Sequence, residues 1–408
     1  MEVVYERCAG LDVHKNEIVA CVRIGSGAAG RREHGRFRAT TAGLLELKEW
    51  LASLECKHAV MEATGVYWKP VWHVLEDGIE LVLANARHVK NVPGRKSDMN
   101  DAAWLADLLA HGLVRGSFVP PKPIRELRDL TRTRRQLVRE QVQHMQRIEK
   151  VLEDANLKLS SVLSDTFGQT GRRILDALVE GKLDPHYLVT LASDRVRATE
   201  AELLAALTGR PTDHHRFLLK LHLGQLNALA GSIATLDDQI EKCLDPFRWA
   251  ATELDAIPGI SWVAAVSVIA EIGIDMAQFP TAAHLVSWAG LCPRLDESAG
   301  KKRDTRTRDG NPWLKSLLVQ CALSAGRKTN SYYRSLYGRI KARRGAKKAA
   351  VAVAASLLTA AYHILKSGVC YQDLGPSFLQ NRDKKVITAH LIKRLSALGV
   401  EVEIRKAA

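Results

Sequence analysis

Four carboxylates in the first quarter of the chain stand where apolar segments end or where a helix is expected to begin. Asp12 follows the apolar segment that ends at Leu11, and Glu62 follows the segment that ends at Met61. Asp98 and Asp101 are three residues apart, so on a helix their side chains would share one face. A carboxylate at the end of a buried strand needs a partner or a metal ion to offset its desolvation.

Carboxylates on two strand ends and one helix can converge at one edge of a sheet. Oxygen ligands at this density suit Mg²⁺ or Mn²⁺, and two such ions can stabilise the attacking and leaving oxygens of a phosphodiester. Each residue also has a simpler interpretation. Asp98 and Asp101 could form a capping box, Asp12 could lie in a turn, and Glu62 could end an exposed strand. The joint placement favours the metal site, and we interpret the neighbouring acids as surface charges: Glu17, Glu76, Asp77 and Asp107.

The elements that must position these carboxylates alternate between strand and helix. β-branched and apolar runs predict strands over residues 8–13, 18–24, 36–40, 58–61 and 79–83. Periodic apolar residues predict helices from residue 41, over 68–75 and over 98–111. The order of three strands, helix, strand, helix, strand and helix predicts an α/β layer domain with a mixed sheet.

Three prolines, at positions 120, 121 and 123, separate this region from a long helical one. Apolar residues recur every three or four positions over residues 125–150, which predicts a helix that could pair as a hairpin or coiled coil. The fold class is therefore α/β plus α. We predict four segments: an α/β domain over 1–115, a helical or coiled-coil linker and assembly region over 116–250, a mainly helical domain over 251–370 and a tail over 371–408.

The excess positive charge of the chain is concentrated in its last third. The formal net charge is +14, and residues 301–348 alone contain 15 Lys and Arg against two Asp. Such a block predicts binding to the phosphate backbone of nucleic acid. The segment around Gly259 resembles a helix-hairpin-helix turn, in which backbone N–H groups approach a phosphate. The candidate nucleic-acid contacts are Gly259, Lys301, Lys302, Arg303, Arg343, Arg344, Lys347 and Lys348.

The cysteines and the most apolar run carry no special chemistry. Seven cysteines without a CxxC pair suggest neither a disulfide framework nor a zinc site. Residues 349–365 are apolar but too short for a clear membrane span, and they contain Tyr362 and His363, which favours a buried core helix. The N-terminus lacks the pattern of a signal peptide. We therefore expect a bacterial cytoplasmic protein, and we do not expect this protein to enter the membrane.

Three phrases between residues 10 and 109 carry a resemblance to a known family: GLDVHKN at 10–16, MEATGVYWKP at 61–70 and KSDMNDAAWLADLL at 96–109. They resemble the DEDD transposases of the IS110 group of insertion sequences, which includes the Piv-like DNA invertases. The resemblance implies a RuvC-type, RNase H-like first domain. It also implies that Asp12, Glu62, Asp98 and Asp101 bind divalent metal.

The same resemblance extends into the second half of the chain, through AIPGIS at 256–261, WAGLCPR at 288–294, SAGKKR at 298–303 and GNPWLK at 310–315. Composition alone places Ser298 in a flexible cationic loop and gives it no activating base. The family pattern implies that Ser298 is a nucleophile that forms a phosphoserine link to DNA. Ala299 stands where glycine is common in the family, and Lys315 stands where arginine is common.

The resemblance further implies a non-coding bridge RNA that pairs with donor and target DNA, and a composite site in a dimer or tetramer. We therefore expect a transposase or site-specific recombinase of an insertion sequence. Two alternatives remain open from the sequence. One is a metal-dependent nuclease of RuvC type that uses water and forms no covalent intermediate. The other is a non-catalytic nucleic-acid-binding protein on the same scaffold.

Overall fold

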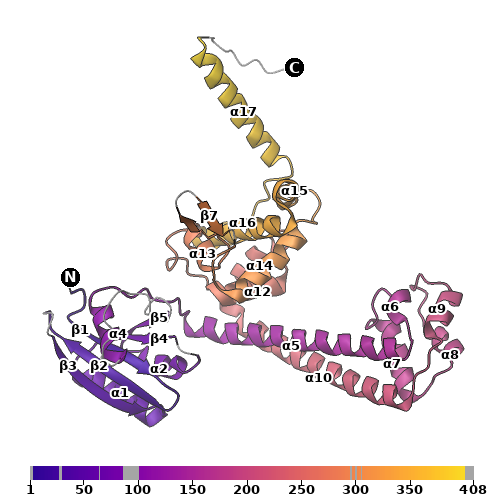
Figure 1. Ribbon diagram of the computed structural model, residues 1–408, viewed down its shortest axis with the longest axis horizontal. Helices are drawn as coiled ribbons and strands as arrows, with labels where there is room; N and C mark the ends of the chain where they lie inside the picture. Colours follow the sequence, from indigo (N-terminus) through magenta and orange to yellow (C-terminus); the bar gives the residue numbers. More distant parts are fainter. Residues whose placement is uncertain are drawn as a thin grey trace. The chain divides into compact units, whose positions relative to one another are not determined.

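The computed structural model divides into two compact units, Met1–Val119 and Pro120–Ala408 (Figure 1). It describes residues 3–26, 30–63, 65–85, 101–294, 296–298, 301–304 and 306–399. The division falls beside the prolines at 120, 121 and 123. The finer division of the residues after Pro120 remains a prediction, and Asp98 lies outside the described residues.

A five-stranded mixed sheet forms the centre of the first unit. Its order is β3-β2-β1-β4-β5. The pairs β1–β2 and β2–β3 are antiparallel, whereas β1–β4 and β4–β5 are parallel. The prediction of a mixed sheet is confirmed. The strands span β1 Arg7–Val13, β2 Glu17–Ile24, β3 Arg31–Arg38, β4 His58–Glu62 and β5 Glu80–Ala84.

The third strand begins five residues before the predicted 36–40. It pairs with β2 along its whole length, from Ile24 opposite Arg31 to Glu17 opposite Arg38. The strand is an edge strand rich in charged residues, and its burial alternates between exposed and half-buried. Hydrophobicity therefore gave no signal for its start, which is decided by pairing to β2.

Helices cover both faces of this sheet. The helices α1 (Thr41–Ser53) and α2 (Trp68–Leu75) share a core with alternate residues of the strands, among them Leu11, Ile18 and Met61. On the other face lies α4 (Asp101–Ala110), which packs on β1, β2 and β4. Leu105 and Leu109 of α4 form a second core with Val60. The sheet is thus buried from both sides, as a layered α/β domain requires.

A long helical hairpin opens the second unit. Helices α5 (Lys122–Asp154) and α10 (Asp213–Cys243) pack along each other (Figure 1). Short helices fill the connection at the far end: α6 Leu159–Val162, α7 Gln169–Glu180, α8 Pro185–Thr190 and α9 Glu200–Leu207. Ile148 and Leu152 of α5 share a core there with Leu219 and Leu223 of α10. The remainder after the first unit is mainly helical, as predicted.

The rest of the second unit is a helical body with one small β-hairpin. The helix α16 lies at its centre and packs against α13, α14 and α15. It is long and apolar enough to cross a membrane by composition, yet ten of its residues are buried among these helices. It is a core helix, as expected. The elements are η1 Asp245–Phe247, α11 Arg248–Asp255, α12 Trp262–Ile272, α13 Ala282–Trp288, β6 Asp296–Ser298, β7 Lys301–Asp304, α14 Pro312–Ala325, α15 Tyr332–Arg344, α16 Ala346–Ser367 and α17 Phe378–Ala397.

Candidate functional site

Asp12 and Glu62 lie at the same level on two neighbouring parallel strands. Leu11 of β1 is in register with Met61 of β4, so the two carboxylates follow this pair directly at the carboxyl ends of the strands. Asp12 is the sixth of seven residues in β1, and Glu62 is the last residue of β4. The carboxyl edge of parallel strands is where open α/β sheets usually place their ligand sites.

Both carboxylates belong to the sheet face that α4 covers. Side chains alternate between the two faces of a strand, and the odd-numbered Leu11 and Met61 lie in the core under α1 and α2. Val60 lies on the opposite face with α4, which places Glu62 on that face as well. The Asp12 side chain is 25% exposed. It is therefore neither a core residue nor a freely solvated surface charge.

Gly10 brings the start of α4 directly onto β1. A Cβ atom at this position would lie 2.0 Å from the carbonyl oxygen of Ala102 and 2.5 Å from the amide nitrogen of Ala106. Any side chain would push the helix away. The glycine therefore allows the first turn of α4, which begins with the exposed Asp101, to lie on the strand that carries Asp12.

Three of the four predicted ligands can thus be placed on one face of the first unit: Asp12, Glu62 and Asp101. Within the described ranges, no three His, Cys, Asp or Glu side chains are close enough together to hold a metal ion. Asp98, the fourth predicted ligand, lies outside those ranges. Carboxylate oxygens are the type of ligand that a hard divalent cation prefers. Two of these carboxylates, Asp12 and Glu62, lie at the same edge of the sheet.

His14 is a neighbour of Asp12 that the sequence analysis did not single out. Its Nε2 atom lies 3.0 Å from Oδ2 of Asp12. The two residues are two positions apart at the end of an extended strand, and this spacing puts their side chains on one face. That spacing was visible in the sequence. The imidazole can orient the carboxylate.

Asp107 is not the surface charge that we expected. Its side chain is only 18% exposed and lies 3.3 Å from Nε of Arg23 and 2.8 Å from Nη2 of Arg32. Arg23 is 1% exposed, so it needs a carboxylate partner inside the protein. The sequence prediction was wrong because it asked only whether Asp107 shares a helix face with Asp101. It did not consider that Arg23 of β2 reaches α4 and contacts Asp107 there.

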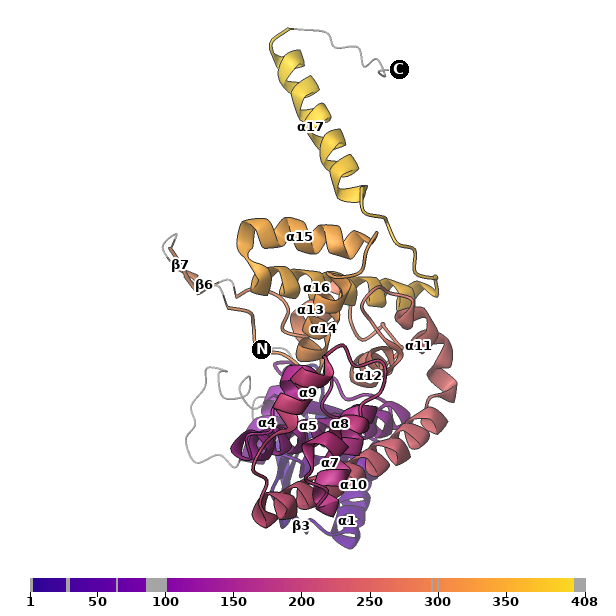
Figure 2. The same cartoon turned by 90° about the vertical axis from the view of Figure 1, so that its right-hand side faces the viewer.

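Ser298 ends a β-strand, whereas composition alone predicted a flexible loop. It pairs with Lys301 in the antiparallel hairpin of β6 and β7. The pairing continues toward the body, where the Arg294 amide donates to the Arg306 carbonyl at 2.8 Å. Figure 2 shows the hairpin standing out from the helices of this unit. Because this strand consists of charged and polar residues, its backbone pairing with β7, rather than hydrophobicity, decides where it forms.

The base of this hairpin is closely packed. A Cβ atom on Gly310 would lie 2.3 Å from the amide nitrogen of Gly290, so the two backbones touch. Lys315 donates from Nζ to the hydroxyl of Thr307 and to the carbonyl of Arg308. Lysine therefore has a structural role at this position.

The predicted nucleic-acid contacts fall into two groups. Arg343, Arg344, Lys347 and Lys348 are exposed at the corner between α15 and α16. Gly259 has a positive φ of 91°, and a Cβ there would lie 2.5 Å from the backbone of α14. Helix packing is thus a sufficient reason for that glycine, and its phosphate contact stays a prediction. The other predicted contacts lie on β7: Lys301, Lys302 and Arg303.

The buried cysteines offer no competing nucleophile. All seven are free thiols. Burial raises the pKa of Cys8 to about 12 and the pKa of Cys56 and Cys321 to about 11. Reaction requires the thiolate, so these buried groups are inert at neutral pH.

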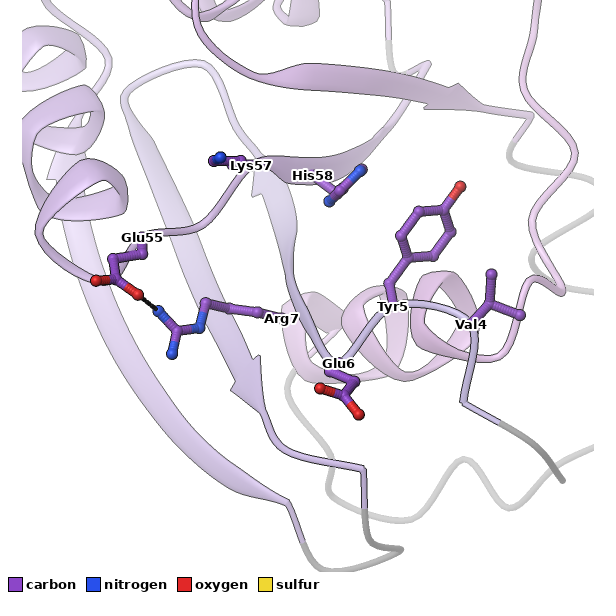
Figure 3. Close-up of a pocket in the computed structure, with 7 residues that line it drawn as sticks. All are labelled: Val4, Tyr5, Glu6, Arg7, Glu55, Lys57 and His58. Carbon is purple, nitrogen blue, oxygen red and sulfur yellow. Dashed lines mark hydrogen bonds and ion pairs between the residues drawn. The ribbon is translucent and has the colours of Figure 1, made fainter.

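A pocket of about 560 Å³ opens at the opposite end of the sheet from Asp12 and Glu62 (Figure 3). Arg7 and His58, the first residues of β1 and β4, lie in its wall. Two of its residues form pairs with acids: Arg7 contacts Glu55, and His58 lies 3.2 Å from Glu80. The pocket therefore does not coincide with the carboxylate edge.

The fold and the site define a protein with a carboxylate-bearing mixed-sheet domain and a basic helical unit, a combination suited to phosphodiester chemistry. A family model described as a transposase of the DEDD, IS110 type matches residues 9–157. A second, described as the transposase IS116/IS110/IS902 family, matches residues 251–338. No curated protein matches the chain. The chain belongs to the IS110 family of transposases, and the family resemblance seen in the sequence is confirmed. DNA is its substrate class, and strand cleavage and transfer are its class of activity.

Proposed function

We propose that this transposase is a site-specific recombinase that cuts DNA through a serine nucleophile assisted by a divalent-metal carboxylate site. The metal ligands are Asp12, Glu62, Asp98 and Asp101. The observation that supports the proposal is the register of β1 with β4, which puts Asp12 and Glu62 at the carboxyl ends of two neighbouring parallel strands, on the sheet face that α4 covers. Such a site would hold Mg²⁺ or Mn²⁺, which when bound stabilises negative charge on the reacting phosphate.

In the proposed reaction, Oγ of Ser298 attacks a phosphorus atom of the DNA backbone. A bond forms between Oγ and phosphorus, and the bond from phosphorus to one sugar oxygen breaks. The departing DNA strand end takes up a proton, while the serine hydroxyl loses one. A second strand end can then reverse the exchange at the same phosphorus, which rejoins the DNA without external energy.

The basic corner of α15 and α16 supports DNA binding in this proposal. Arg343, Arg344, Lys347 and Lys348 are exposed within six residues of one another. Like charges at this density repel, and a phosphate backbone relieves that repulsion and releases counterions. We further propose that a bridge RNA guides the choice of donor and target DNA, and that the protein acts in the cytoplasm as a dimer or tetramer.

The test is the capture of a covalent protein–DNA adduct. Labelled element-end DNA is incubated with the protein and Mg²⁺, with the co-purifying RNA retained, and is separated under denaturing conditions. The wild type should give an adduct that disappears in Ser298→Ala and on removal of the metal. Ser324→Ala, which changes an exposed serine of α14, should retain the adduct.

The carboxylate variants complete the test. Asp12→Ala and Glu62→Ala should each reduce adduct formation on the order of 10²–10⁴-fold, since metal stabilisation of the transition state amounts to several kcal/mol. Cleavage without any adduct, still dependent on metal, would indicate a nuclease that uses water. Binding without cleavage under all metal conditions would indicate a non-catalytic protein.

A further inference from the structure

The β-hairpin that carries Ser298 depends on its base for its orientation. Its strands β6 and β7 contain three and four residues, and a two-stranded hairpin is only marginally stable by itself. It joins the helical body through two base segments, residues 291–294 and 306–309. These segments pair with each other, since the Arg308 amide donates to the Cys292 carbonyl at 3.0 Å. Whatever fixes the base segments therefore fixes the direction in which the hairpin leaves the body.

The second base segment leads into α14, and buried groups fix the first turn of that helix. Asn311, the N-cap of α14, donates from Nδ2 to Oε2 of Glu271 at 2.6 Å. Its Oδ1 atom accepts hydrogen bonds from the amides of Trp313 and Leu314, at 3.0 and 3.1 Å. Glu271 is 3% exposed and accepts two further hydrogen bonds from Arg132 of α5. The start of α14 is thus held by both α12 and α5.

Trp313 attaches the same turn to α5 a second time. Its carbonyl accepts a hydrogen bond from Nη1 of Arg135 at 2.8 Å. The guanidinium carbons of Arg132, Arg135 and Arg139 lie 5.3–5.5 Å from the centre of its ring, and cation–π contacts of this kind are attractive. The first turn of α14 is therefore a fixed support next to the hairpin.

Lys315 extends from this fixed turn to the second base segment. Its Nζ atom donates to the hydroxyl of Thr307 and to the carbonyl of Arg308. Lysine has three donors on one nitrogen, so a single side chain can hold two neighbouring acceptors. Both acceptors are neutral oxygens, and the side chain is half-buried. The contact therefore orients the base segment and neutralises no charge.

We infer that Lys315 is a positioning residue for Ser298. By holding Thr307 and Arg308 against α14, it fixes the base of the hairpin and with it the position of the serine. The inference rests on the proposed function, in which the Ser298 hydroxyl is the nucleophile. Attack requires the reacting atoms to lie about 3–3.5 Å apart, and a displacement of about 1 Å can lower the rate about 10²-fold. Lys315 acts through the hairpin and does not contact the phosphate.

The first measurement needs no DNA. Trypsin cleaves after lysine and arginine, so cleavage after Arg306 and Arg308 reports how often the second base segment opens. Lys315→Met keeps a long apolar side chain and removes the donors, whereas Lys315→Arg keeps the charge and the donors. Cleavage at these two sites should be about tenfold faster in Lys315→Met, because loss of a hydrogen bond from a charged donor increases the open population by about this factor. Lys315→Arg should be cleaved at close to the wild-type rate.

The second measurement is the rate of Ser298 adduct formation over a series of DNA concentrations. In Lys315→Met the maximal rate should fall about 10²-fold, while the DNA concentration at half-maximal rate stays unchanged. Lys315→Arg should recover most of the rate. The matched control is Lys328→Met, which removes an exposed cation shortly after the end of α14 and should behave as the wild type. All three variants should keep the wild-type melting temperature.

The other outcomes would overturn the inference. A higher half-saturating DNA concentration at an unchanged maximal rate would make Lys315 a DNA contact. A loss of rate that comes with a lower melting temperature, or that Lys315→Arg does not restore, would leave Lys315 with a merely structural role. Unchanged trypsin cleavage with an unchanged maximal rate would show that the base segment does not need this side chain. Absence of the adduct in the wild type would instead count against the proposed function, and the trypsin measurement would still decide whether Lys315 holds the base segment.

Discussion

Gly10 shows how a residue without a side chain can control a site. The carbonyl of Ala102 and the amide of Ala106 occupy the space that a Cβ atom would need. The position of Asp101 at the start of α4 therefore depends on the absence of a methyl group two residues before Asp12. Glycine is required at this position because the backbone of α4 approaches β1 closely, whatever the backbone angles of Gly10 are.

Gly10→Ala should lower both stability and activity. The added methyl group must displace α4, and overpacking of this kind typically costs about 1–3 kcal/mol. Denaturant unfolding of the wild type and variant would measure the cost, and adduct formation would measure the effect on the carboxylates. Gly78→Ala is the matched control, since no atom lies within 4 Å of its Cβ position. An unchanged unfolding midpoint for Gly10→Ala would contradict the close packing.

At the scale of elements, buried Glu271 of α12 joins three helices. It accepts hydrogen bonds from Arg132 of α5 and from Asn311, which also caps the N-terminus of α14 through the amides of Trp313 and Leu314. Burial lowers the pKa of Arg128 to about 10, and the attraction of Glu271 offsets part of that shift. The network holds the helical body on the long hairpin.

Glu271→Ala should therefore destabilise the second unit strongly. Removal of one member of a buried ion pair leaves the other charges uncompensated and typically costs about 3–5 kcal/mol. The exposed pair of Arg172 and Asp176 provides the comparison, because Asp176→Ala should cost only about 0–1 kcal/mol. Thermal and denaturant unfolding would measure both. A small loss for Glu271→Ala, similar to that of Asp176→Ala, would show that solvent or another acid neutralises the arginines.

At the scale of the whole molecule, the proposed nucleophile and the proposed metal ligands belong to different units. Ser298 lies in the second unit, and Asp12 and Glu62 lie in the first. Attack on phosphorus requires the hydroxyl and the phosphate to be within about 3–3.5 Å of each other. The proposed reaction therefore requires the two units to meet around the DNA. The helix α5 alone, with 33 residues, is about 50 Å long, which is enough to carry Ser298 toward another subunit.

We predict that the site forms between subunits. Ser298→Ala and Asp12→Ala should each be inactive alone and should recover single-strand cleavage when mixed, because a mixed oligomer contains one intact pair of units. At equal concentrations with random exchange, recovery should reach a substantial fraction of wild-type cleavage. The measurement is single-strand cleavage of labelled DNA after confirmed subunit exchange. Failure of every mixing ratio to restore cleavage would favour a site within one chain.

The sequence by itself determined the elements whose signals are local. The apolar run before Glu62 predicted β4, and the periodicity after the prolines predicted the long helix α5, because strand and helix periods are written in neighbouring residues. Asp12 and Glu62 were predicted as ligands because a carboxylate after an apolar strand is conspicuous, and that prediction awaits its test. The family followed from phrases around those residues.

Only the tertiary structure decided the features that depend on distant partners. The edge strand β3 and the hairpin that carries Ser298 contain mostly charged or polar residues, so pairing with another strand, rather than hydrophobicity, decides where they lie. Arg23 could be recognised as buried, and Asp107 as its partner, only once α4 was placed on β2. On α5, the sequence did not show that Arg132 forms an ion pair with the buried Glu271 of α12, nor that Arg135 donates a hydrogen bond to the Trp313 carbonyl of α14. The bonds from Arg132 to Glu271 and from Arg135 to Trp313 link residues 139 and 178 positions apart, and no local pattern encodes them.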